Sequence, residues 1–240
     1  MKFEKTKVMN FEGAFRGMRN PLESWNKSDS DFSEGCHFAE YDDMCESCPY
    51  FAGFGEPCLP KIGENDLNLA KRLIKGGSEH RKFLRQIFIS VDITAPLYWW
   101  KEFDTYKIGT TANSTSTMHK VQSKPITLEC FEIDDLCNVY FDDEINNEIG
   151  FGGDVEYFIQ RLEKLRQQYL ETKDKRYWKE LIRWLPESWL QTRTITMNYE
   201  NVRNIYFQRR NHKLTEWSDS FIKWVESLPY AKELITYTGE

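Results

Sequence analysis

The apolar residues of this 240-residue chain recur with two different periods, which limits the fold to one that mixes helices with strands. Between residues 155 and 165 they recur every three to four positions, with charged side chains between them, and this pattern predicts an amphipathic helix. Residues 83–93 are rich in branched and aromatic residues and alternate in part from Phe88 on, which predicts a strand. Since 40% of the residues are apolar, the chain can bury a core. We therefore expect an α+β fold with a central sheet and flanking helices.

Start and stop signals delimit the other elements. Asp66 is a candidate N-cap, Pro96 suits the first turn of a helix, and Asn198 is placed to cap another helix. These signals predict helices over residues 67–75, 96–107, 176–184, 198–211 and 214–227, and a strand over residues 191–197.

Residues 1–65 differ from the rest of the chain. They are rich in Gly, Pro, Asp and Ser and show no sustained helical or alternating pattern. We therefore expect an irregular, cysteine-containing N-terminal segment over residues 1–65, followed by one folded domain over residues 66–240.

Charge and hydropathy exclude several classes of function. A net charge of −6 repels phosphate over the chain as a whole, which argues against binding of duplex DNA or RNA. No stretch approaches the roughly 20 apolar residues of a membrane-spanning helix, and the first residues lack the apolar centre of a secretory signal. We expect a cytoplasmic protein. Its aromatic content of 15% suits the core, subunit contacts or a planar ligand.

Four of the six cysteines lie close together in the N-terminal segment. Two of them have the C-x2-C spacing that supplies two ligands of a tetrahedral zinc site, and two flanking thiols would complete it. The outer spacings match no standard zinc finger, so unligated thiols are the alternative, and a reducing compartment argues against a disulfide. The candidate ligands of a structural zinc ion are Cys36, Cys45, Cys48 and Cys58.

An aromatic helix after Ala95-Pro96 runs into a tract of hydroxyl residues, and this segment resembles the flavin-dependent thymidylate synthases. That family carries an Ala-Pro, an aromatic helix and the motif R-H-R-x-x-S-x-N-x-x-S-x-R-Y. Aligned from Ala95, the motif retains a positive charge at Lys107 and hydroxyls at Thr110 and Thr115. A shift by one residue places Ser116 on the second motif serine, and both registers remain open. The motif histidine and its other arginines are absent.

A second segment resembles the C-terminal part of the same family. A Leu-Pro at 185–186, a strand ending in Asn, and a helix of the form N-x5-N-x4-R follow in the family's order. Asn198, Asn204 and Arg209 occupy the three polar positions. Asn198 and Arg209 are about three helical turns apart and share a face, which could hold one ligand.

The resemblance implies a flavin-dependent thymidylate synthase-like fold, FAD as cofactor and a homotetramer. The implied reaction methylates dUMP at C5, with methylenetetrahydrofolate as carbon donor and NADPH as reductant. In this interpretation Arg209 polarises the uracil, Asn198 and Asn204 contact the flavin, Lys107 and Thr110 remain from the flavin and phosphate loop, and Thr115 and Ser116 bind the nucleotide. Because threonine carries no charge where the family has arginine, an inactive nucleotide-binding protein is one alternative. The cysteine cluster gives a second, a zinc-stabilised interaction protein on the same fold.

Overall fold

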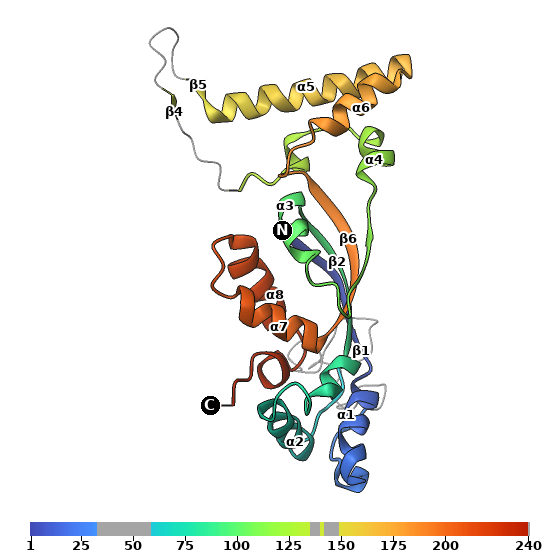
Figure 1. The fold of residues 1–240 in the computed structure, drawn as a ribbon, viewed down its shortest axis with the longest axis vertical. Coiled ribbons are helices and arrows are strands. Elements are labelled where there is room, and N and C mark those ends of the chain that lie inside the picture. Colours follow the sequence, from blue (N-terminus) through green and yellow to red (C-terminus); the bar gives the residue numbers. More distant parts are fainter. Residues whose placement is uncertain (33–58, 135–139, 142–148, 240) are drawn as a thin grey trace, which may run out of the picture. The chain divides into compact units, whose positions relative to one another are not determined.

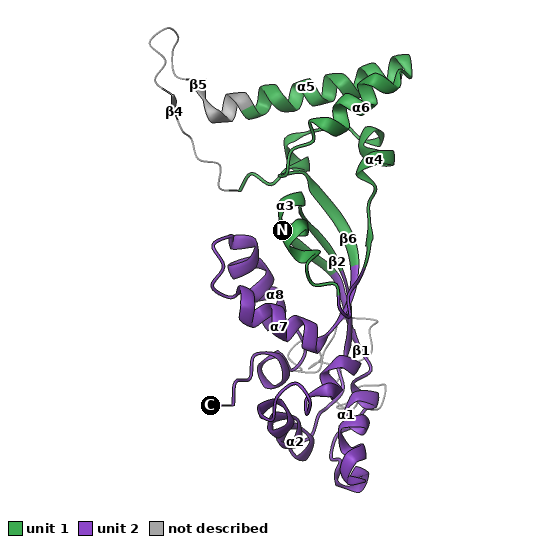
Figure 2. Cartoon of the chain, in the orientation of Figure 1, with its two compact units in different colours: residues 1–4, 92–107, 112–194 green, residues 5–91, 108–111, 195–240 purple. Residues whose placement is uncertain are grey.

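The computed structural model describes residues 1–32, 59–134, 140–141 and 149–239 (Figure 1). It is a mixed fold of helices and sheet, as the sequence predicts. The chain divides into two compact units, coloured separately in Figure 2. Unit 1 comprises residues 1–4, 92–107 and 112–194, and unit 2 comprises residues 5–91, 108–111 and 195–240.

A four-stranded sheet of order β1-β2-β6-β3 contains both predicted strands. Its strands are β1 (Lys2–Met9), β2 (Phe88–Pro96), β3 (Thr111–Ser114) and β6 (Leu190–Asn198). A separate antiparallel pair consists of β4 (Tyr140–Phe141) and β5 (Ile149–Gly150).

Side-chain hydrogen bonds give the direction of the two central strands. The hydroxyls of Thr94 and Thr192 lie 2.7 Å apart, and the Thr194 hydroxyl donates to Asp92 Oδ1 at 2.6 Å. Since the residue number falls on β2 as it rises on β6, the two strands are antiparallel.

The core of unit 1 is formed largely by two helices that pack against each other. The helices of this unit are α3 (Leu97–Phe103), α4 (Thr117–Lys120), α5 (Phe151–Thr172) and α6 (Lys175–Arg183), with 3₁₀ turns at Val121–Ser123 and Leu128–Cys130. The predicted helices at 155–165 and 176–184 correspond to α5 and α6, which pack against each other. Their apolar faces and the preceding loop bury Val121, Ile126, Phe131, Ile159, Leu162 and Leu181.

Unit 2 is built mainly from helices. They are α1 (Phe11–Arg19), α2 (Glu64–Lys75), α7 (Tyr199–Arg209), the π-helical turns Glu216–Phe221 and Ala231–Ile235, α8 (Ile222–Glu226), and 3₁₀ turns at Asn20–Leu22, Trp25–Lys27 and Lys82–Gln86. Tyr199, Trp217 and Phe221 are fully buried among them. None of the helices in the described parts of the chain is both long and apolar enough to cross a membrane.

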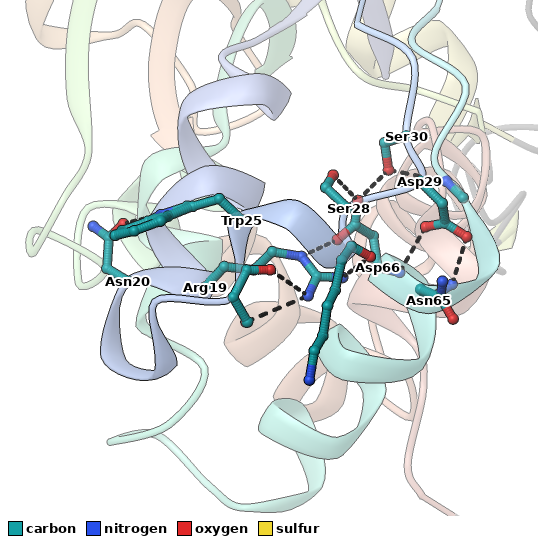
Figure 3. A network of polar contacts seen from close by, with 11 residues as sticks. Arg19, Asn20, Trp25, Ser28, Asp29, Ser30, Asn65 and Asp66 are labelled. Atoms are coloured by element: carbon teal, nitrogen blue, oxygen red, sulfur yellow. Dashed lines mark hydrogen bonds and ion pairs between the residues drawn. The ribbon is translucent and has the colours of Figure 1, made fainter.

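Asp66 is fully buried in unit 2 and is surrounded by donors (Figure 3). Arg19 Nε donates to it at 2.6 Å, and the hydroxyls of Ser28 and Ser30 donate at 2.6 and 2.5 Å. Asp29, and not Asp66, supports the first turn of α2, because its carboxylate accepts the backbone N–H of Asp66 at 3.1 Å. The prediction that Asp66 is an N-cap is therefore wrong: α2 begins at Glu64, and the Asp66 carboxylate neutralises a buried arginine.

Other predicted boundaries are corrected in the same way. Residues 83–86 belong to a 3₁₀ turn, so the strand predicted from Phe83 begins at Phe88. Pro96 precedes α3 as its N-cap, and the helix predicted to residue 107 ends at Phe103. The helix predicted over 214–227 consists of a π-helical turn followed by α8.

The expectation of irregular structure before residue 66 is wrong for part of that segment. β1 and α1 occupy most of the first nineteen residues. The division of the chain at residues 65 and 66 remains a prediction, and residues 33–58 lie outside the described part.

Candidate functional site

Asn198 begins α7 and caps it reciprocally with Asn201. The Asn198 Oδ1 accepts the backbone N–H of Asn201 at 2.9 Å, and the Asn201 Oδ1 accepts the backbone N–H of Asn198 at 3.2 Å. Both bonds satisfy N–H groups that a helix start otherwise leaves without partners. The predicted cap is confirmed, and Asn198 is only 9% exposed.

The loop before β3 is fitted against this helix start. Asn201 Nδ2 donates to the carbonyl of Ile108 at 2.7 Å, within unit 2. Gly109 has a φ of 74°, and a Cβ there would lie 2.8 Å from Asn201 Oδ1 and 3.1 Å from Asn198 Nδ2. Only glycine satisfies both the left-handed backbone and the close approach. Thr110, a predicted flavin contact, follows in this loop and is half-buried.

The other two predicted residues of α7 differ in their surroundings. Asn204 is exposed, whereas Arg209 is half-buried, with its Cζ 4.9 Å from the ring centroid of Trp217. Along the helix, Asn198 and Arg209 are about 16 Å apart at about 1.5 Å per residue. One small ring therefore cannot contact both side chains, but an extended ligand such as a dinucleotide can.

Two predicted nucleotide-binding residues line a cavity of ≈ 450 Å³ within unit 1. Thr115 and Ser116 belong to its wall, and Lys107, which is exposed, does not. The cavity is further lined by Thr117, Lys120, Val121, Ser123, Lys124, Pro125, Cys130, Trp189, Leu190 and Thr192. We call it the hydroxyl–lysine cavity.

The fold resembles that of solved flavin-dependent thymidylate synthases. A crystal structure of ThyX from Helicobacter pylori, complexed with FAD and dUMP, superposes with a TM-score of 0.63 at 16% identity, and 98% of each chain is covered. A second structure of the same protein with FAD and dUMP gives a TM-score of 0.60 at 16% identity and the same coverage.

A related nucleotide methylase also matches. The UMP/dUMP methylase PolB from Streptomyces cacaoi, bound with 5-Br UMP, gives a TM-score of 0.50 at 13% identity and covers 74% of this chain and 84% of its own. No family model and no curated protein matches the sequence. At these identities the likeness supports the resemblance at the level of the fold, and the roles of individual side chains remain predictions.

The thymidylate synthase motif gave no indication of several residues that shape these sites. Lys120, Lys124 and Thr192 line the hydroxyl–lysine cavity, and Asn201 holds the loop before β3. The N-x-x-N spacing at 198–201 is a capping-box signal that could have revealed Asn201. Cys130 is half-buried and also belongs to the cavity wall.

The predicted zinc ligands fall outside the described residues. Cys36, Cys45, Cys48 and Cys58 all lie within residues 33–58, so the zinc site remains a prediction. Among the residues that the structure does describe, no group of three or more His, Cys, Asp or Glu side chains could hold a metal ion.

A larger cavity of ≈ 840 Å³ lies between α5 and α6 in unit 1. Its wall includes Tyr157, Tyr177 and Trp184 together with Arg161 and Lys164. None of the residues singled out by the sequence motifs belongs to this wall.

Proposed function

We propose that the chain is a flavin-dependent nucleotide methylase of the thymidylate synthase type. It binds FAD and dUMP and transfers the one-carbon unit of methylenetetrahydrofolate to C5 of the pyrimidine, with NADPH as the reductant. The end-to-end likeness to the Helicobacter pylori structures carries the proposal, because both of those hold FAD and dUMP and 98% of each chain is covered. The assembly is a cytoplasmic homotetramer.

The polar residues of α7 support this proposal by their chemistry. Arg209 offers a planar array of donors that suits a pyrimidine carbonyl, and its packing on Trp217 fixes the guanidinium. Asn204 is exposed, and its amide can both donate and accept a hydrogen bond. Asn198 uses its oxygen for the helix cap, so its Nδ2 is the group that remains for a ligand.

The chain offers side chains of the kinds that FAD requires. The edge of a flavin ring presents carbonyl oxygens and an N–H group, and asparagine side chains can satisfy both. Lys107 is exposed in the segment before β3 and can pair with a phosphate. When bound, FAD supplies the redox chemistry of the transfer.

A nucleotide-binding protein without turnover is the second candidate. It is favoured by one observation: in the alignment from Ala95, Thr105 and Thr117 stand where the family motif has arginines, and a threonine hydroxyl cannot replace a bidentate guanidinium.

One assay separates the two candidates. Purified protein is incubated with FAD, separated from free cofactor and examined for flavin absorbance. It is then mixed with methylenetetrahydrofolate, NADPH and dUMP that carries tritium at C5. Release of tritium to water by flavin-containing protein supports the methylase. Binding of dUMP without release supports the second candidate, and colourless protein that binds no dUMP contradicts both.

A further inference from the structure

We propose that Lys120 and Lys124 bind the phosphate of a pyrimidine nucleoside monophosphate in the hydroxyl–lysine cavity. This inference rests on the proposed function. It identifies two lysines that supply the positive charge of the missing motif arginines.

Charge distinguishes this cavity from the one beside it. Two ammonium groups and no carboxylate line the hydroxyl–lysine cavity, although the chain as a whole has a net charge of −6. A neighbouring cavity of ≈ 530 Å³ shares Cys130, Trp189 and Leu190 with it but is lined by three carboxylates. These are Glu129, Glu132 and Asp134, and two cations of the same wall, Lys2 and the Met1 N-terminus, offset two of the three charges. The lining of the first cavity is therefore net positive and that of the second net negative, so a phosphate is favoured in the first.

Neither lysine is neutralised within the described part of the chain. No described carboxylate forms an ion pair with Lys120 or Lys124, whereas Lys101 in the same unit pairs with Glu187 at 2.6 Å. The hydroxyls of Thr115 and Thr117 likewise make no hydrogen bond with another described residue. Two charged donors and two hydroxyl donors are thus available to one anion.

Further hydroxyls at the cavity are partly used by the protein itself. Ser116 Oγ accepts the backbone N–H of His119 at 2.9 Å and keeps its own proton for a ligand. Ser123 Oγ donates to the carbonyl of Lys120 at 2.6 Å, so this hydroxyl shapes the turn between the two lysines.

Helix α5 fixes the segment that carries Lys124. Arg166 Nη1 donates to the carbonyl of Gln122 at 3.2 Å, and the Glu163 carboxylate accepts the backbone N–H of Ile126 at 2.8 Å. Lys124 lies between these two attachment points. Since its backbone is held on both sides, less conformational entropy is lost when its side chain binds an anion.

Strand β6 fixes the opposite wall. The backbone N–H of Thr115 donates to the carbonyl of Thr192 at 2.9 Å, and Gln191 Nε2 donates to the carbonyl of Thr115 at 2.9 Å. The hydroxyl tract is therefore held in place before any ligand arrives.

The remaining wall suits a nucleoside better than a bare anion. Val121, Pro125, Trp189 and Leu190 contribute apolar surface, and a volume of ≈ 450 Å³ falls within the usual range of small-molecule sites, about 300–1,000 Å³. Lysine binds phosphate as a point charge and needs no fixed bidentate geometry, so two lysines can take over the charge of the absent arginines.

Calorimetric titration of the full chain tests the proposal, with dUMP, deoxyuridine and inorganic phosphate as separate probes. The test variant is Lys120→Ala/Lys124→Ala, and Lys179→Ala is the control, because Lys179 is an exposed lysine of α6 that is not part of the cavity wall. We expect the double variant to bind dUMP at least tenfold more weakly, since each contact is a hydrogen bond to a charged group. We expect the double variant to bind deoxyuridine as tightly as the wild type does. The Lys179→Ala variant should keep the wild-type affinity for dUMP. Circular dichroism confirms that both variants are folded.

The outcomes separate this inference from the proposed function. Equal dUMP affinity of wild type and double variant overturns the lysine assignment and leaves the proposed function intact. Lysine-dependent binding of inorganic phosphate by a protein that binds neither FAD nor dUMP overturns the proposed function and the nucleotide assignment together, and leaves a site for a bare anion. A wild-type protein that binds none of the phosphate-bearing probes overturns the inference.

Discussion

Glu163 and Arg166, one turn apart on α5, hold each other through two hydrogen bonds. Arg166 Nε donates to Glu163 Oε2 at 2.7 Å and Nη2 donates to Oε1 at 2.6 Å. The same carboxylate accepts the backbone N–H of Ile126, so the pair attaches the segment before Ile126 to the helix. These donors, with Arg166 the strongest, lower the pKa of Glu163 from its ordinary value of 4.5 to about 2.

The lowered pKa of Glu163 predicts a stability loss in acid. The contribution of the ionised carboxylate is complete above about pH 4.5 and is lost as the pH falls through the folded-state pKa near 2. The loss amounts to about 3 kcal/mol at most, since a tenfold change in the protonation equilibrium corresponds to about 1.4 kcal/mol. Urea unfolding of wild type and Glu163→Gln between pH 5 and about pH 2 measures it.

The difference in unfolding free energy between wild type and Glu163→Gln reports on this carboxylate alone, because all other carboxylates are present in both proteins. We expect the wild type to lose its advantage over Glu163→Gln across that interval, whereas the control Glu156→Gln, on the exposed side of α5, changes neither stability nor its pH dependence. A constant difference between wild type and Glu163→Gln would contradict the assigned pKa.

The buried pair of Arg19 and Asp66 predicts a large loss of stability in unit 2. Asp66→Ala leaves the Arg19 guanidinium buried without its anion, which costs about 3–5 kcal/mol. Thermal unfolding measures the change. The exposed ion pair of Glu79 with Lys82 provides the control, and Glu79→Ala leaves the transition unchanged. Equal effects of the two substitutions would show that the network in Figure 3 adds nothing to stability.

Substitution of Asn198 separates helix capping from flavin binding. Asn198→Ala removes the cap and costs about 1 kcal/mol, whereas Asn198→Ser keeps a side-chain oxygen and restores most of that loss. Serine lacks the amide nitrogen, so if Asn198 Nδ2 contacts the flavin, Asn198→Ser binds FAD more weakly than wild type despite its restored stability. Equal FAD affinity of Asn198→Ser and wild type would restrict Asn198 to a structural role.

Arg209 has a matched control in its neighbour. Arg209 lies over Trp217, and exposed Arg210 lies over Phe207 with its Cζ 5.3 Å from the ring centroid. Each substitution by alanine removes one positive charge and one cation–π contact of about 0.5–1 kcal/mol. We expect Arg209→Ala to lower dUMP affinity at least tenfold, measured by titration calorimetry, and Arg210→Ala to leave it within about twofold. Similar losses for both variants would indicate a general effect of charge.

The elements that the sequence predicts best are those with a strong local pattern. The amphipathic period of α5 and the amide cap of α7 involve residues close in sequence, and both are confirmed. β1 was missed because six of its eight residues are exposed, which leaves no alternation of apolar and polar residues. α1 contains two glycines, although Phe11, Ala14, Phe15 and Met18 have the helical spacing that could have revealed it.

Contacts between distant parts of the chain set the limits of that prediction. Asp66 looks like a helix cap until its partner Arg19, 47 residues earlier, is known. The hydroxyl–lysine cavity likewise joins residues 115–125 to Thr192, and no local spacing connects them. The family motif identified two of its residues, Thr115 and Ser116. Lys120 and Lys124 could be recognised as part of the wall only from the structure.

The reciprocal cap at the start of α7 also affects how divergent relatives of this fold should be compared. An asparagine that caps the start of a helix stabilises the fold whether or not a flavin binds. Asn204 is exposed on the same helix and takes no part in its cap. A survey for working enzymes should therefore give more weight to position 204 than to position 198.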